Sequence, residues 1–221
     1  MKIDDLIVQL AQDAGPVVPP PAPSARLGRW AGRALLVTAV TVLVIGARAD
    51  AMALLRQPAF LGLGAATLLT ALLSAACALV LSIPGAERSP MQRALPFAAA
   101  SAWIGLLAVL VGAGGNAVSR LLALPIHPLC IIEIAGLGLI PGWTLFEMLR
   151  RAAPLQRTWT AALATLAAVS MGAVGTQLLC PIDDPAHHLV GHVIPVAIFT
   201  VIGAVACTPF LDWMRIRIDA R

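Results

Sequence analysis

Long apolar runs without charge divide the chain. Charged residues border the runs 34–47, 57–86, 94–119, 158–182 and 185–211, and a sixth run near 128–146 is interrupted only by Glu133. A helix of about 20 apolar residues crosses the roughly 30 Å hydrocarbon core of a bilayer, and most of these runs are long enough. The pattern predicts an all-α fold, a polytopic membrane bundle of six transmembrane helices within residues 29–211.

The first run is the shortest, and it has two readings. Trp30 and Gly32 extend it, and Arg33 can reach the headgroups along its aliphatic stem, so we count it as a span. The alternative is a signal peptide, because Ala49-Asp50-Ala51 has the small-x-small form of a cleavage site. Some 33 residues, including Asp4, Asp5 and Asp13, precede the run, whereas a signal peptide has a short basic start, so the span is favoured.

An amphipathic pattern precedes the first span. Apolar residues recur at helical spacing and acidic residues lie mostly opposite, and we expect this helix to bind a partner through Ile3, Asp4, Asp5, Leu6, Ile7 and Leu10. Residues 1–14 are too short for a stable isolated helix, so the stripe must dock on a protein, on the membrane or on the chain's own loops. Acidic residues argue against an anionic membrane. Residues 15–28 are proline-rich and predict an extended linker.

The distribution of positive charge predicts the topology. Of 15 Lys and Arg residues, only Arg48, Arg56 and Arg120 fall in loops on the side opposite the N-terminus. Cytoplasmic loops carry the excess of Lys and Arg, so both termini, including the tail 212–221, are expected in the cytoplasm of a bacterial inner-membrane protein. The basic residues are scattered over several segments, which fits contact with the lipid bilayer and not direct binding of nucleic acid.

Histidine, cysteine and aspartate residues gather at one end of the last three spans, on the side of the membrane opposite the termini. This candidate metal-binding set is His127, Cys130, Cys180, Asp183, His187, His188 and His192. Asp184-Pro185 predicts an N-cap and first helical residue, after which His188 and His192, four residues apart, would share a face. Thiol and imidazole ligands suit zinc, copper or cadmium, while the alternative is a set of polar side chains hydrated at a helix end.

Cys130 and Cys180 leave three interpretations open. At an oxidising membrane face they could form a disulfide or reversible dithiol, they could bind metal, or they could be plain structural thiols. Cys77 and Cys207 lie within apolar runs and are expected to be packing residues. Glu133 lies inside a span, where a carboxylate needs a partner, so it is a candidate for coupling a signal or for a structural hydrogen bond.

The sequence contains no catalytic motif that we recognise. It has no Ser-x-x-Lys, no His-Glu-x-x-His and no phosphate-binding glycine loop, so we expect a protein that is not an enzyme and requires no cofactor. A transition or heavy metal ion would enter only as a signal. Gly138 and Gly142 permit close helix contact, and Glu147 is expected to pair with Arg150 and Arg151.

The whole pattern resembles the NrsF-type negative regulators of sigma F, a family of six-span membrane anti-sigma factors. The resemblance rests on the start Met1 to Ile7 with its proline-rich spacer, on Cys130, and on Cys180 followed by Asp183-Asp184 and His187-His188-x-x-x-His192. It implies that the N-terminal segment sequesters an extracytoplasmic-function sigma factor. It also implies that Cys130 and Cys180 sense a periplasmic metal or redox stress and cause release.

Two other functions remain as alternatives. A small metal-handling transporter would use Glu133 and the histidine cluster on its path. A redox partner would pass electrons through Cys130 and Cys180, which the absence of Cys-x-x-Cys disfavours. The inducing signal, the identity of the sigma factor and the oligomeric state are not predicted by any pattern in the sequence.

Overall fold

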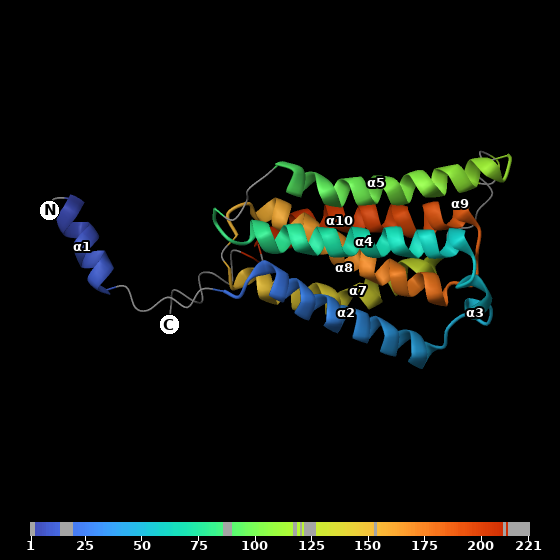
Figure 1. Cartoon of the computed structure of the whole chain (residues 1–221), viewed down its shortest axis with the longest axis horizontal. Coiled ribbons are helices and arrows are strands. Elements are labelled where there is room, and N and C mark those ends of the chain that lie inside the picture. The colour runs from blue at the N-terminus through green and yellow to red at the C-terminus, as the bar shows by residue number, and fades with distance from the viewer. Residues whose placement is uncertain are drawn as a thin grey trace.

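Six long apolar helices form one bundle in the computed structural model, which describes residues 3–13, 20–85, 90–116, 119, 121, 127–152, 154–209 and 211 (Figure 1). The spans are α2 (Pro23–Ile45), α4 (Pro58–Leu81), α5 (Pro90–Ala113), α7 (Pro128–Arg150) and α8 (Arg157–Leu179), and a sixth made of α9 (Pro185–His188), the π-helical turn η1 (Leu189–Val193) and α10 (Ile194–Ala206). A short α3 (Ala51–Leu54) lies in a loop. The predicted fold class is confirmed.

Proline sets where most of the spans begin. All the spans except α8 start with proline, which has no backbone N–H to leave unsatisfied in the first turn. A span of 23 residues is about 34 Å long, enough to cross the hydrocarbon core. We call the end of the bundle where α2 begins and α7 ends the basal end, and the opposite end, where α7 begins, the distal end.

Helix α8 occupies the centre of the bundle. It packs against α4, α7 and α10, and its inward residues are mostly Ala, Gly, Ser and Thr. Small residues let neighbouring backbones approach closely inside a membrane. Its backbone lies very close to that of α7, where a Cβ added at Gly172 would lie 2.2 Å from the Ile134 carbonyl oxygen. Gly138 and Gly142 of α7 both face Ala168 of α8, so the small-residue motif lies in this interface.

Helix α2 is hydrogen-bonded to α7 near the basal end. The indole Nε1 of Trp30 donates to the Pro141 carbonyl at 2.9 Å, and Trp30 is fully buried. One turn earlier, the Arg26 guanidinium donates to the carbonyl of Met148 and to the Oγ of Ser82, the C-cap of α4. These bonds connect the first span to the helix that carries Cys130 at its other end.

Helix α1 (Ile3–Asp13) lies apart from the bundle in Figure 1. Its apolar stripe is exposed, with Ile3 at 77% and Ile7 at 58%, while the side chains of Leu6 and Leu10 lie outside the described residues. Helix α2 begins at Pro23, inside the segment 15–28 suggested as a linker, because this proline can open a helix. Residues 14–19 and the tail 212–221 lie outside the described residues.

Candidate metal-binding site

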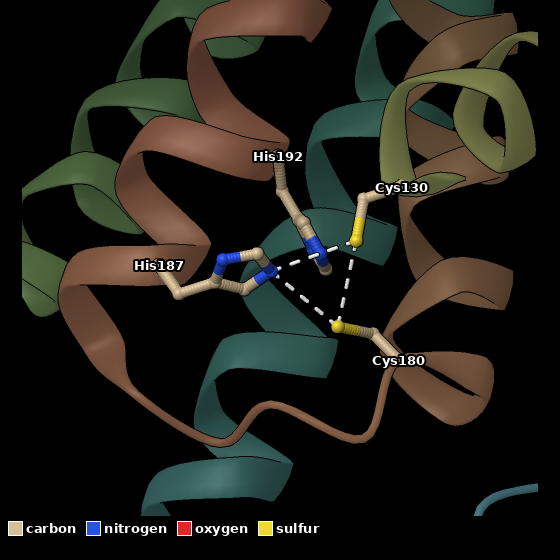
Figure 2. A group of neighbouring side chains, drawn as sticks. All are labelled: Cys130, Cys180, His187 and His192. Atoms are coloured by element: carbon tan, nitrogen blue, oxygen red, sulfur yellow. Dashed lines mark hydrogen bonds between the residues drawn. The ribbon is translucent and has the colours of Figure 1, made fainter. Parts of the chain in front are cut away.

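Two thiols and two imidazoles meet at the distal end of the bundle. Figure 2 shows Cys130, Cys180, His187 and His192 turned toward one another, and one ligand atom from each lies within 4.8 Å of all the others. The two sulfur atoms are 3.5 Å apart, and His187 Nε2 lies 3.5 Å from the Cys130 sulfur and 3.4 Å from the Cys180 sulfur. All four residues are buried.

Cys130 takes its place from the start of α7. His127 is the N-cap and Pro128 opens the helix, so Cys130 falls in the first turn with its N–H donating to the His127 carbonyl. The close contact of α7 with α8 at Gly172 then holds this turn beside the C-terminus of α8.

Cys180 takes its place from the end of α8. Its N–H still donates to the Thr176 carbonyl, but its backbone is extended, with φ −66° and ψ 122°. Pro181 explains this change, because a residue before proline is pushed out of the helical region. The chain therefore leaves α8 at Cys180, and the thiol turns toward Cys130.

The π-helical turn η1 brings the two histidines together. In an α-helix His187 and His192, five residues apart, would point in different directions, whereas the Ile194 N–H here donates to the Leu189 carbonyl, five residues back. This wider turn places both rings toward the thiols. Gly191 leaves room for the His187 ring, since a Cβ there would lie 3.0 Å from it.

The N-cap predicted at the start of this helix is confirmed. Asp184 Oδ1 accepts a hydrogen bond from the Ala186 N–H at 2.8 Å, and Pro185 opens α9. His188 and His192 do lie close, with ring centroids 4.5 Å apart, as their spacing suggested. The histidines that lie beside the thiols, however, are His187 and His192. His188 Nε2 is buried without a hydrogen-bond partner among the described residues.

The distances fit a tetrahedral metal site. With metal–sulfur bonds of about 2.3 Å and metal–nitrogen bonds of about 2.0–2.1 Å, the ligand atoms of a tetrahedral ion are about 3.3–3.8 Å apart. The three separations among the ligand atoms of Cys130, Cys180 and His187 fall in this range. Two thiolates and two imidazoles form a donor set that zinc, copper and cadmium accept. A metal ion could therefore be bound with little movement of the backbone.

The two thiols differ in their electrostatics. The Cys130 thiol donates a hydrogen bond to the Cys180 sulfur, which lowers the pKa of Cys180 below that of an ordinary cysteine. A thiolate is both the metal ligand and the nucleophile in disulfide chemistry. Cys180 is therefore the thiol of the pair that ionises first.

Other residues of the predicted set lie around the cluster and not in it. The His127 ring is 6.2 Å from the His187 ring, and Asp183 pairs with Arg48 at 4.0 Å. Glu133 lies one turn below Cys130 on α7, half-buried, and its Oε2 has no hydrogen-bond partner among the described residues. Burial raises the pKa of Asp183, although Arg48 opposes this.

Arg48 supports the site, and sequence reasoning treated it only as a loop charge. Its side chain is buried and holds Asp50 through two hydrogen bonds of 2.6 and 3.0 Å, which raises the pKa of Arg48 and lowers that of Asp50. Its backbone N–H donates to the Leu178 carbonyl and its guanidinium to the Pro181 carbonyl. Arg48 thus fixes the loop on both sides of Cys180. Arg48-x-Asp50 was the only signal of this in the sequence.

The comparisons with known proteins give the family. The model of the NrsF family, described as negative regulator of sigma F, matches residues 10–213, which include all six spans and the four clustered residues. This chain belongs to the NrsF family. The resemblance drawn from the sequence is thereby confirmed, and the NrsF protein is a negative regulator of a sigma factor. No curated protein and no solved structure matches the chain.

Proposed function

We propose that this NrsF protein is an anti-sigma factor of the bacterial inner membrane. Helix α1 holds an extracytoplasmic-function sigma factor at the cytoplasmic face, and a metal ion or oxidant at the periplasmic cluster causes release. The observation that carries this proposal is the separation of two features. A buried Cys and His cluster lies at the distal end, while the chain leaves the basal end toward a helix with an exposed apolar stripe.

Helix α1 has the character of a docking segment. It has 11 residues, is marginal as an isolated helix in water, and exposes Ile3 and Ile7. Its first turn carries Asp4 and Asp5, which favours a basic groove on a protein over an anionic membrane surface. A sigma factor bound through such a stripe would be kept from RNA polymerase at the membrane.

The orientation follows from charge. The loops and ends at the basal side carry most of the Lys and Arg residues, which supports a cytoplasmic basal end. The distal cluster then faces the periplasm, where metal ions and oxidants arrive first. It also lies on the side where disulfides persist.

The cluster offers two chemistries for the signal. Metal binding displaces the thiol protons of Cys130 and Cys180 and leaves their sulfurs and two imidazole nitrogens on the ion. Oxidation by a peroxide-class oxidant removes two electrons and two protons from the thiols and forms one disulfide, while the peroxide is reduced to water or alcohol. The sulfurs would move from 3.5 Å to about 2.05 Å. Oxidation therefore draws α7 toward the end of α8, whereas a metal ion links the same two helix ends at close to their present separation.

Helix α7 provides a path from the cluster to the basal end. It carries Cys130 in its first turn, and in its C-terminal half Pro141 and Met148 accept hydrogen bonds from Trp30 and Arg26 of α2. A shift of α7 against α8 would therefore be transmitted to α2, and α2 is joined through the linker to α1. A tenfold release of the sigma factor needs only about 1.4 kcal/mol of coupling.

The sigma-binding half is tested by co-purification in mild detergent from the native host. Ile3→Asp with Ile7→Asp should abolish recovery of a sigma factor, whereas Gln12→Ala on the opposite face of α1 should keep it. Removal of residues 1–14 should by itself switch the target genes on. If the sigma factor binds the doubly substituted protein as well as wild type, α1 is not the docking segment. A transporter would instead keep its metal phenotype after this deletion.

The sensing half is tested by cadmium titration of the purified protein, followed through the ultraviolet cadmium–thiolate absorbance. Cys130→Ser with Cys180→Ser should remove the absorbance and the metal response of the target genes, whereas Cys207→Ser should leave both. His187→Ala and His192→Ala should weaken binding while the thiolate absorbance remains. Unchanged metal and peroxide induction in the double serine variant would refute sensing at this site.

A further inference from the structure

A positively charged cavity opens at the basal end between α2 and α7, on the side of the bundle where the linker begins. It has a volume of about 320 Å³, and Arg26, Arg29 and Arg33 of α2 line it together with Glu147 of α7 and Arg151, the C-cap of that helix. The three α2 arginines are three and four residues apart, so they form one stripe along the helix. Positive-inside topology requires arginines near this end but does not require them to meet in one cavity.

The charge of this cavity is not balanced within the described part of the chain. Its one carboxylate, Glu147, already accepts hydrogen bonds from Arg150 and Arg151. Arg29 and Arg33 form no ion pair among the described residues.

Arg26 is the strongest sign that an anion belongs here. Only 3% of it is exposed, and it donates to the Ser82 hydroxyl and the Met148 carbonyl, both neutral acceptors. A buried guanidinium without a counter-ion is costly, and a bound anion removes this cost. Arginine forks match the oxygen geometry of phosphate, so a phosphate group is the anion that this cavity suits best.

The surroundings of the cavity indicate that the phosphate belongs to a lipid. On α2, Leu36 continues the face of Arg29 and Arg33 toward the middle of the membrane and is 64% exposed. On α7, Ile140 lies seven residues before Glu147 on the same face and is 53% exposed. Apolar side chains exposed at this depth face acyl chains. A soluble phosphate would not contact these apolar side chains.

We propose that this cavity binds the headgroup phosphate of an anionic phospholipid, with the acyl chains lying along Leu36 and Ile140. Basic pockets between transmembrane helices are a recognised form of headgroup site. Pro20, the first described residue after the gap at 14–19, also lines the cavity. A bound headgroup would therefore touch the base of the segment that leads to α1. The proposal does not depend on sigma binding or on metal sensing.

The test is lipid titration of the full-length protein in mild detergent, with bound lipid counted by native mass spectrometry. Dioleoyl phosphatidylglycerol should bind at one tight site, and dioleoyl phosphatidylcholine should bind far more weakly. Arg29→Ala with Arg33→Ala should weaken the phosphatidylglycerol site about thirtyfold, which corresponds to about 2 kcal/mol. Arg56→Ala with Arg93→Ala removes the same charge elsewhere and should change affinity less than twofold.

Three outcomes would overturn the proposal. The first is equal retention of the two lipids by wild type, and the second is an equal loss in both double variants, which would indicate a general charge effect. The third is displacement of phosphatidylglycerol by millimolar glycerol 3-phosphate, which would assign the cavity to a soluble phosphate. Should the Arg29 and Arg33 double variant not fold, Arg33→Ala alone is the variant to titrate, with an expected loss of about fivefold.

Discussion

Replacement of Gly172 by alanine tests the contact that holds the site together. The added Cβ would lie 2.2 Å from the Ile134 carbonyl oxygen, 3.0 Å from its carbonyl carbon and 3.1 Å from the Gly138 nitrogen. These are backbone atoms of α7, which cannot turn aside as a flexible side chain can. Helices α7 and α8 must therefore separate by about 1 Å. Overpacking of this kind costs typically 1–3 kcal/mol, and the backbone contact places this case near 3 kcal/mol.

The matched control lies on the facing helix. A Cβ added at Gly136 of α7 would meet nothing within 4 Å, so Gly136→Ala should be neutral or stabilise by up to about 1 kcal/mol through helix propensity. For a chain of this size, a loss of about 3 kcal/mol lowers Tm by roughly 6–12 °C. Thermal unfolding in detergent, followed by the fluorescence of the buried tryptophans Trp30 and Trp103, measures the difference.

The same variant has a consequence at the cluster. Separation of α7 from α8 moves Cys130 away from Cys180, so mild oxidation should form the disulfide more slowly in Gly172→Ala than in Gly136→Ala. Mass spectrometry of the peptides under non-reducing conditions measures the rate. If Gly172→Ala has the Tm of wild type and forms the disulfide at the wild-type rate, the backbones of α7 and α8 do not lie as close at Gly172 as described.

Two further substitutions test buried hydrogen bonds by the same unfolding measurement. Trp30→Phe removes the indole donor to the Pro141 carbonyl, which keeps the Thr144 hydroxyl, and puts a smaller ring in a fully buried position, so it should cost about 1–3 kcal/mol. Trp159→Phe, at a side chain 50% exposed, should cost less than about 0.5 kcal/mol. Gln177→Leu leaves the Phe60 carbonyl without its 3.0 Å donor and should cost about 1–3 kcal/mol; an unchanged Tm would mean that this carbonyl finds another partner.

The sequence predicts the six spans well for two reasons. Side chains that face lipid must be apolar, and a bilayer admits few backbone structures. It also predicts which helix ends lie together, since an odd or even number of crossings decides the side. That reasoning was sufficient to place Cys130, Cys180 and the histidines in one region. It could not predict how close they lie, because that distance depends on the packing of α7 against α8.

The choice of histidines shows where a periodicity argument ends. Spacing by four favoured His188 and His192 on one face, on the assumption of regular α-helix. The π-helical turn changes the period, so that His187 reaches the thiols. Pro195 was the available signal, because proline lacks an N–H and crowds the carbonyl four residues before it, at Gly191. Buried Arg26 was likewise hidden, since charge counting along a sequence does not report burial.

The cluster draws its ligands from three places along the chain, with Cys130 the first and His192 the last. A membrane protein is made from its N-terminus, so both cysteines are in place before the last span has been inserted. The histidines follow only with that last span. Completion of the site is thus a property of the finished chain, and a copy that stalls before its sixth helix has the two thiols without the imidazoles. Such a copy would be open to oxidation but would lack half of its metal donors.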